Sequence, residues 1–224
     1  GSASSADALS AGPRPPSPID PLHPPRVSLS GIRDGDFIIG GPLRFELEVK
    51  DFPMEAGWQE ARIVLNQTMV KKVIRPSQSV ELNEGMVEGL NRLTVYLARS
   101  FNESVKAPGA SQSLSFFYKK KDVSRAAKNT GPGILLVAPA LSYRGEEGKK
   151  IPFDFLLTQN SEGKRYRVYY TLDGATREVG VEGAPYYFYN LAQGTHVLTI
   201  ELMDSRGKPI KAPFARYETQ FQIE

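Results

Sequence analysis

Short segments in which apolar and polar residues alternate are the clearest feature of the chain. Along residues 43–50, every second residue from Leu43 to Val49 is apolar, and the residues between them are charged. A period of two is typical of a strand that buries one face. Similar short apolar stretches recur between turn residues, at intervals of roughly ten residues. The pattern favours no helix of more than a turn or two, and it predicts an all-β protein built from antiparallel sandwiches.

One strand–turn–strand segment is written twice. Gly89–Leu97 returns as Gly194–Leu202, and the following Lys106-Ala107-Pro108 returns as Lys211-Ala212-Pro213. The spacing is 105 residues in both cases. Because an unbroken register through a turn is rare by chance, we interpret the chain as two copies of one domain.

The repeat extends to the earlier strands of each copy. We expect two tandem antiparallel β-sandwiches with about seven strands each. Three further alignments follow from the alternation: residues 151–157 with 43–49, Val168 and Tyr170 with Ile63 and Leu65, and Tyr187 and Tyr189 with Val80 and Leu82.

The composition of the connecting segments sets the domain boundaries. We expect domains at residues 26–119 and 133–224, joined by a basic linker at 120–132. Residues 1–25 are rich in Ser, Ala and Pro and predict a disordered tether, in which Gly1-Ser2 looks like the remnant of an expression tag. Two other readings of this segment are a linker from a longer protein and, at Pro13–Pro16, a peptide ligand for an aromatic groove.

Composition narrows the functional classes. Hydrophobic residues make up 40% of the chain, no apolar run is long enough to span a bilayer, and there is no cysteine. A net charge of +3 gives no argument for nucleic-acid binding. The two histidines are too far apart for a metal pair, and no Gly-x-Ser-x-Gly motif, phosphate-binding loop or dinucleotide-binding motif is present. The fold could bring two carboxylates together, as a stand-alone hydrolase would require, but nothing in the sequence selects a pair. We therefore expect no catalytic residue, no metal site and no cofactor.

Aromatic residues supply one candidate binding surface. In Tyr186-Tyr187-Phe188-Tyr189 the pleat sends alternate side chains to opposite faces. The alignment above places Tyr187 and Tyr189 inward, so Tyr186 and Phe188 are expected to point outward and to stack on a sugar or pack on a partner. The alternative is that they contact the neighbouring domain or the tether. For Trp58 we favour a place in the core over an exposed anchor.

The turn inside the first copy supplies the second candidate. Residues 99–108 are more polar and longer than a hairpin requires, and loops on rigid sandwiches often carry function. The alternative is a surface salt-bridge cluster that fixes the turn. The candidate ligand-binding residues here are Arg99, Phe101, Glu103 and Lys106.

Two motifs underlie a resemblance to a known group of proteins. The second copy has a Gly-x-His-x-Leu strand at Gly194–Leu198, followed by an Asp-x-x-Gly-Lys-Pro turn at Asp204–Pro209. With these motifs the chain resembles tandem immunoglobulin-like or fibronectin-III-like domains of bacterial secreted proteins and lipoproteins. In the first copy, Arg99, Glu103, Ser104 and Lys106 match a variant turn found in uncharacterised bacterial proteins, whereas Ser100 and Phe101 depart from it.

The resemblance implies a fold but carries no activity. We expect a non-catalytic, extracytoplasmic module that binds or spaces, as in a surface lipoprotein or adhesion-type protein, with a protein or a glycan as ligand. Membrane association would come only through a tether or lipid anchor upstream. The alternative is an accessory region of a larger secreted enzyme.

Overall fold

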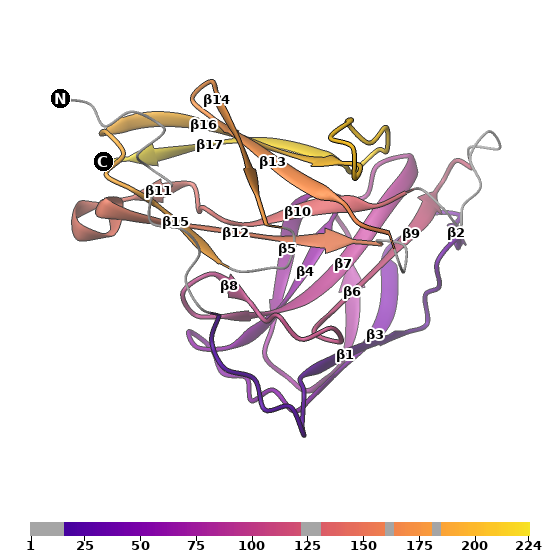
Figure 1. The fold of residues 1–224 in the computed structure, drawn as a ribbon. Coiled ribbons are helices and arrows are strands. Elements are labelled where there is room, and N and C mark those ends of the chain that lie inside the picture. Colours follow the sequence, from indigo (N-terminus) through magenta and orange to yellow (C-terminus); the bar gives the residue numbers. More distant parts are fainter. Residues whose placement is uncertain (1–15, 122–130, 160–163, 181–184) are drawn as a thin grey trace. The chain divides into compact units, whose positions relative to one another are not determined.

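The computed structural model describes residues 16–121, 131–159, 164–180 and 185–224. These residues form two compact units, which we call domain 1 (residues 17–131) and domain 2 (residues 132–224). Figure 1 labels the strands of both. The predicted disorder of residues 1–15 and most of the predicted basic linker lie outside the described residues. No helix in the described part of the chain is long and apolar enough to cross a membrane.

Domain 1 is a sandwich of two sheets. One sheet has the order β1-β3-β6, and the other has the order β2-β9-β7-β4-β5, with the short β8 paired to β7. All pairings are antiparallel except that of β2 with β9. The strands are β1 (Arg26–Ser30), β2 (Phe37–Ile38), β3 (Leu43–Lys50), β4 (Glu60–Leu65), β5 (Thr68–Val73), β6 (Ser77–Leu82), β7 (Gly89–Arg99), β8 (Glu103–Ser104) and β9 (Ser111–Tyr118).

Domain 2 repeats this topology. Its sheets have the orders β10-β12-β15 and β11-β17-β16-β13-β14, and the short β11 runs parallel to β17. The elements are β10 (Gly133–Ala138), β11 (Ser142–Tyr143), the 3-10 helix η2 (Gly145–Lys149), β12 (Lys150–Thr158), β13 (Arg167–Leu172), β14 (Ala175–Val179), β15 (Tyr186–Tyr189), β16 (Gly194–Met203) and β17 (Arg216–Ile223).

The predicted fold class is confirmed. Each domain has a sheet of three strands that faces a larger sheet, and this grouping of strands is that of the immunoglobulin-like and fibronectin-III-like sandwiches. Among the described residues, seven strands in each domain are four residues or longer, and the remainder are two-residue segments. The expected number of about seven strands per domain therefore agrees with the structure.

The core of domain 1 follows from the alternation in β3. Leu43, Phe45, Leu47 and Val49 are buried, and the charged residues between them are exposed. They pack with apolar residues of β4 and β7 in the opposite sheet, such as Ile63. Full burial of one such side chain stabilises the fold by about 1.5–3 kcal/mol relative to exposure.

The core of domain 2 is built on aromatic rings. The rings of Phe153 and Phe188 stack with centroids 4.8 Å apart, and Tyr170 lies edge-on to Phe153 at 5.4 Å. Phe155 and Tyr186 complete the cluster at 5.6 and 6.1 Å from Phe153. Aromatic pairs at these separations add to the stabilisation that comes from burial alone.

The repeated segment folds identically in its backbone hydrogen bonds. Val105 N donates to Leu97 O in domain 1, and Ile210 N donates to Leu202 O in domain 2. Asn102 has a positive φ of 55°, and the equivalent Gly207 has 81°. The same spacing of 105 residues relates further pairs: Leu97 N to Ala110 O with Leu202 N to Ala215 O, Asn102 N to Arg99 O with Gly207 N to Asp204 O, and Phe117 N to Asp36 O with Gln222 N to Leu141 O.

The spacing between the copies is not constant in the earlier strands. Ala61 pairs with Leu97 in domain 1, and Val168 pairs with Leu202 in domain 2, so Val168 is equivalent to Ala61 at a spacing of 107 residues. The predicted match of Val168 with Ile63 is wrong by two residues. An error of two leaves the same side chains facing the core, because the side-chain period of a strand is two.

The predicted match in β15 is wrong by one residue, with a larger consequence. Phe188 pairs with Ile151, as Leu82 pairs with Leu43, so the spacing in this strand is 106 residues. A slip of one residue exchanges the two faces of a strand. Tyr186 is therefore 8% exposed and Phe188 0%, and both lie in the core instead of pointing outward. Tyr187 and Tyr189 occupy the outer face and are half-buried.

Candidate functional site

The turn after β7 holds four of the predicted site residues. Arg99 ends β7, and Glu103 begins β8, which folds back on β7 through the pair Arg99–Glu103. Asn102 takes the left-handed conformation between them, which Asn tolerates better than most residues. The backbone therefore brings the Arg99 and Glu103 positions side by side at the end of the sheet.

Glu103 and Arg99 bind the chain's own N-terminal segment. The Ser17 amide donates to Glu103 Oε1 at 2.8 Å, and the Ser17 hydroxyl lies 3.4 Å from Oε2. Arg99 donates to the carbonyl of Pro18 at 3.2 Å. Ile19 packs against the core of domain 1. Because side chains of the turn satisfy backbone groups of Ser17 and Pro18, residues 17–19 belong to the folded domain. Domain 1 therefore begins earlier than the predicted residue 26.

A further hydrogen bond joins Arg99 to the loop before β4. Its Nη1 donates to Gln59 Oε1 at 2.9 Å, and its guanidinium carbon lies 6.0 Å from the centre of the Phe52 ring. Glu103 is only 1% exposed. Because these two charged side chains are engaged within domain 1, they fix the turn and the segment beside it, and a role in holding an external ligand stays a prediction.

The other two predicted residues of the turn are placed differently. Lys106 Nζ donates to Ser104 Oγ at 2.7 Å. Phe101 is 47% exposed, and Trp58, which precedes Gln59, is 48% exposed. The expectation that Trp58 fills the core is wrong, because the core beneath its loop is filled by residues such as Phe52, which is 7% exposed.

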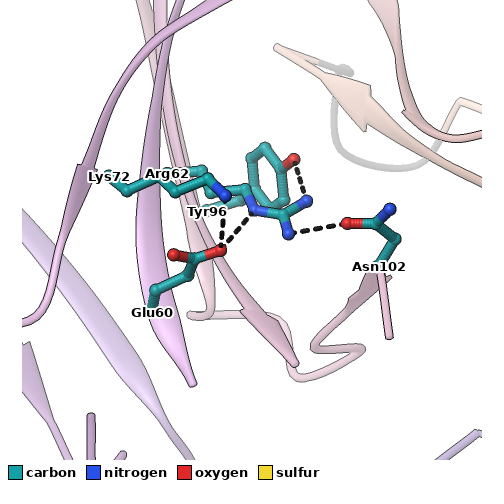
Figure 2. Close-up of polar contacts among 5 residues, drawn as sticks. All are labelled: Glu60, Arg62, Lys72, Tyr96 and Asn102. Carbon is teal, nitrogen blue, oxygen red and sulfur yellow. Dashed lines mark hydrogen bonds and ion pairs between the residues drawn. The ribbon is translucent and has the colours of Figure 1, made fainter. Parts of the chain in front are cut away.

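A polar cluster that the sequence analysis missed lies next to the turn (Figure 2). Arg62 in β4 donates to Glu60 Oε1 at 3.1 Å, to Tyr96 Oη at 3.3 Å and to Asn102 Oδ1 at 2.7 Å. Lys72 Nζ lies 3.6 Å from the same Glu60 oxygen. Alternation alone would have identified Arg62 as a charged residue in an apolar strand, but not its partners Tyr96 and Asn102, which come from β7 and from the turn after it.

The electrostatics of this cluster favour a permanently charged Arg62. Burial lowers the pKa of Arg62, but the interactions with Tyr96 and Glu60 outweigh it, and the pKa is raised above its ordinary value. A cation that is always charged and donates in three directions fixes geometry and transfers no proton. We therefore assign the cluster to the support of the turn at Asn102.

A second buried arginine binds the other end of domain 1. Arg92 is 1% exposed, lies 3.4 Å from the Ser115 hydroxyl and donates to the carbonyl of Gly131 at 2.8 Å. Burial lowers its pKa to about 10, while the Asp34 carboxylate acts in the opposite direction. Asp34 in turn accepts a hydrogen bond from the Ser115 amide at 2.7 Å. Arg92 thus fixes the last residue of the domain.

The outer face of β15 carries the side chains of Tyr187 and Tyr189, as the corrected register requires. Tyr187 and Tyr189 meet edge to face, with ring centroids 5.8 Å apart. Lys150 Nζ, on the neighbouring strand β12, lies 4.1 Å from the centre of the Tyr187 ring. Two rings with a cation on one of them form a surface with both apolar and charged character.

His196 is a structural residue in domain 2. It is 7% exposed, stacks on Phe221 at 5.4 Å, and has both ring nitrogens within hydrogen-bond distance of oxygens of Asp173 and Ala192. Within the described residues, no three His, Asp or Glu side chains gather in a way that would hold a metal ion.

Comparisons with known proteins give low similarity throughout. No family model matches the chain, and no curated protein matches it. Among solved structures, fibronectin(III)-like modules of Clostridium thermocellum CbhA are 15% identical, with 88% of this chain and 94% of that chain covered and a TM-score of 0.31. The central fibronectin-III array of RIM-binding protein is 10% identical, with coverage of 89% and 68% and a TM-score of 0.32.

A third solved structure comes from a glycan-binding protein. Bacteroides ovatus SGBP-B of a mixed-linkage glucan utilization locus, in complex with a mixed-linkage heptasaccharide, is 12% identical, with a TM-score of 0.27. The match covers 89% of this chain but only 47% of that chain. Because all three TM-scores are low, the fold assignment rests on the strand order of each domain and not on these similarities.

Proposed function

We propose that the chain is a non-catalytic, extracytoplasmic module that spaces its neighbours and presents a binding surface for a protein or a glycan. One observation carries the spacing role: domain 1 fixes its chain at both ends. Glu103 and Arg99 bind Ser17 and Pro18 where the chain enters, and Arg92 binds Gly131 where it leaves. A spacer transmits direction only if the connecting chain is held against the folded body.

Hydrogen exchange tests the spacing role. If the entering segment is fixed, the Ser17 amide should exchange more slowly than the amides of residues 3–12, by a factor of about ten or more. Arg92→Met should free the Gly131 carbonyl and shift the backbone resonances of Gly131, while Arg44→Met, at an exposed surface pair, should change neither end. Equal, fast exchange at Ser17 and in residues 3–12 would remove the support for a spacer.

The binding role is supported by Tyr187, Tyr189 and Lys150. Aromatic rings on an outward sheet face stack on the apolar faces of sugar rings and pack against apolar side chains of proteins. An adjacent lysine adds a charged donor for hydroxyl or carboxylate groups. This surface takes the place of Tyr186 and Phe188 in the predicted site. The other predicted contacts, at Arg99, Phe101, Glu103 and Lys106, belong to the spacing role in this proposal.

A glycan array tests the binding role. The native chain is compared with Tyr187→Ala, Tyr189→Ala and the control Tyr169→Ala, which removes a half-buried tyrosine from the larger sheet. The proposal expects loss of binding of at least about tenfold in the first two variants only, as for other aromatic anchors. Binding that all three variants retain would rule out this surface. Binding of the same variants to surface proteins of the source cell tests the alternative that the ligand is a protein.

The proposed location is outside the cytoplasm, with membrane association through a lipid anchor or a further connecting segment upstream of residues 1–25. Protease treatment of intact cells that produce the complete natural protein tests this location. Cleavage in residues 1–16 without cell lysis is expected, because proline- and serine-rich segments offer the protease an unpaired backbone. Protection until the cells are lysed would exclude an exposed location.

A fixed entering and leaving chain also suits an accessory region of a larger secreted enzyme, where it would orient a catalytic domain. The complete natural polypeptide distinguishes the two roles. If it carries a hydrolase domain, removal of domains 1 and 2 should lower activity on polymeric substrate but not on a small soluble one. Equal loss on both substrates would contradict an accessory role.

A further inference from the structure

Domain 2 has a cleft at the position that the N-terminal segment fills in domain 1. In domain 1, Ser17 and Pro18 are bound by Glu103 and Arg99 in the turn after β7, and Arg99 also bonds to Gln59, before β4. In domain 2, a cleft with a volume of about 660 Å³ lies between the residues before β13 and the turn after β16. Its lining includes Tyr166, Asp204 and Ile210. This volume is within the range of ligand pockets in proteins.

The two positions are equivalent strand by strand. β13 is equivalent to β4 at a spacing of 107 residues, so Tyr166 takes the place of Gln59. The turn after β16 is equivalent to the turn after β7 at a spacing of 105 residues. Asp204 therefore takes the place of Arg99, and Lys208 takes the place of Glu103. The residues that would correspond to Ser17–Ile19 lie outside the described residues.

The side chains of the cleft differ in charge from those of domain 1. Lys164 and Arg165 line it and are exposed. Asp204 accepts hydrogen bonds from the amides of Arg206 and Lys208 at 2.8 and 3.0 Å, so its carboxylate is engaged by the turn. Tyr166 and Ile210 add apolar surface. The lining of the cleft therefore combines two exposed cations with apolar surface, which suits a carboxylate beside an apolar side chain.

We propose that this cleft of domain 2 binds an extended, proline-containing acidic peptide of a partner protein, at the position equivalent to that of Ser17–Ile19 in domain 1. Proline favours the extended conformation in which the docked segment presents its carbonyl groups, and it lowers the entropy cost of binding. The inference rests on the proposed function as a binding module and names a protein ligand and a site for it.

The test uses a fluorescein-labelled peptide, Pro-Ser-Pro-Ile-Asp-Pro-Leu, which is the sequence of residues 16–22. Fluorescence anisotropy is measured with the complete chain of 224 residues. Arg165→Glu should weaken binding at least about tenfold, since it puts like charges face to face. Arg177→Glu is the matched control, because Arg177 is exposed on β14. A peptide with Asp replaced by Lys should bind at least about tenfold more weakly to the native chain.

Three results would overturn the proposal: no binding at millimolar peptide, equal affinity of the Arg165→Glu and Arg177→Glu variants, or stronger binding by a peptide of residues 122–130. The last result would make the chain's own linker the occupant of the cleft. Amide chemical shifts locate the site, and changes confined to domain 1 would also contradict the inference. None of these results touches the Tyr187–Tyr189 surface or the fixed chain ends, so the proposed function is tested separately.

Discussion

Oδ2 of Asp173 lies 2.5 Å from Nδ1 of His196, and in domain 1 the equivalent positions are held by Asn66 and Asn91. Asp173 and Asn66 both have positive φ, at 49° and 61°, in the hairpin that follows the first strand of the pair. Each side chain also accepts a hydrogen bond from the amide that follows its partner, at 2.8 Å in domain 2 and 3.0 Å in domain 1.

The partner residues make the second half of the same arrangement. Nε2 of His196 lies 2.7 Å from the carbonyl of Ala192, and Nδ2 of Asn91 donates to the carbonyl of Val87, also at 2.7 Å. The two domains therefore close the same hairpin onto the same strand with different residue types.

Exchanging the pairs between domains tests this equivalence. His196→Ala should lower the free energy of unfolding of domain 2 by about 1–3 kcal/mol, because the buried ring leaves its place against Phe221 and its hydrogen bonds to Asp173 and Ala192 are lost. The double variant Asp173→Asn with His196→Asn recreates the pair of domain 1 and should recover most of that loss. Thermal unfolding of the single and double variants measures the coupling. Additive losses in the double variant would show that the two networks are not interchangeable.

The contact of Glu103 with Ser17 predicts a local effect of mutation. Glu103→Ala should release residues 17–19, because the Ser17 amide loses its acceptor and Arg99 alone retains one carbonyl. Amide exchange at Ser17 and Ile19 should become at least about tenfold faster.

Lys106→Ala is the control for this experiment, since Lys106 Nζ donates to Ser104 Oγ in its own turn. It should leave exchange at Ser17 within about twofold of the native rate. If both variants speed exchange equally, the turn acts as a whole and Glu103 has no particular role.

The corrected register of β15 predicts opposite results for adjacent residues. Phe188→Ala should destabilise domain 2 by about 3–5 kcal/mol, because it empties a place in the aromatic core. Tyr187→Ala should cost only about 1 kcal/mol or less, since the ring is half-buried on the outer face. Denaturant unfolding of the two variants decides between the registers. A larger loss for Tyr187→Ala would restore the original alignment.

The sequence predicted the strands better than the correspondence between the copies. Alternation along β3 identifies Leu43 to Val49 as buried, and the repeat identifies the turn after β7 because its register is unbroken. The earlier strands differ in spacing because loops between them differ in length, and a loop residue leaves no periodic signal. For Val168 the resulting error changed no orientation, whereas for Phe188 it reversed one.

The site was harder to predict because its partners are distant in sequence. Arg99 and Glu103 were correctly selected as unusual residues in a turn, but their partners, Ser17 and Pro18, lie in a segment whose composition predicts disorder. The composition of that segment contains no sign that two charged side chains would satisfy its backbone. The same limit applies to Arg62 and its distant partners Tyr96 and Asn102.

The Arg62 cluster predicts a large effect from a single substitution. Arg62→Ala should lower the free energy of unfolding of domain 1 by about 3 kcal/mol, because a nearly buried Glu60 loses its principal partner. Arg62→Lys should recover little, since an ammonium does not reach three acceptors in different directions. Arg44→Ala, which breaks an exposed pair with Glu81, should cost about 0.5 kcal/mol or less. Denaturant unfolding compares the three, and equal losses would contradict the role of Arg62.

The turn after β16 should respond to acid through Asp204. Hydrogen bonds from the amides of Lys208 and Arg206 hold the pKa of the Asp204 carboxyl below its ordinary value of 3.8, with the Lys208 amide as the largest cause. A carboxyl whose pKa is lower in the folded state stabilises the turn above pH 3.8, and this contribution is lost as the pH falls through the folded-state pKa.

Amide chemical shifts of Arg206 and Lys208, followed by NMR from pH 6 down to about pH 2, should therefore move together with a midpoint below the ordinary pKa of aspartate. The variant Asp204→Asn keeps the acceptor oxygen but removes the titration, so the same amides should show no such transition. In this variant the turn should have equal amide protection across the whole range. A midpoint at or above 3.8 in the native chain would mean that the carboxylate does not hold the turn.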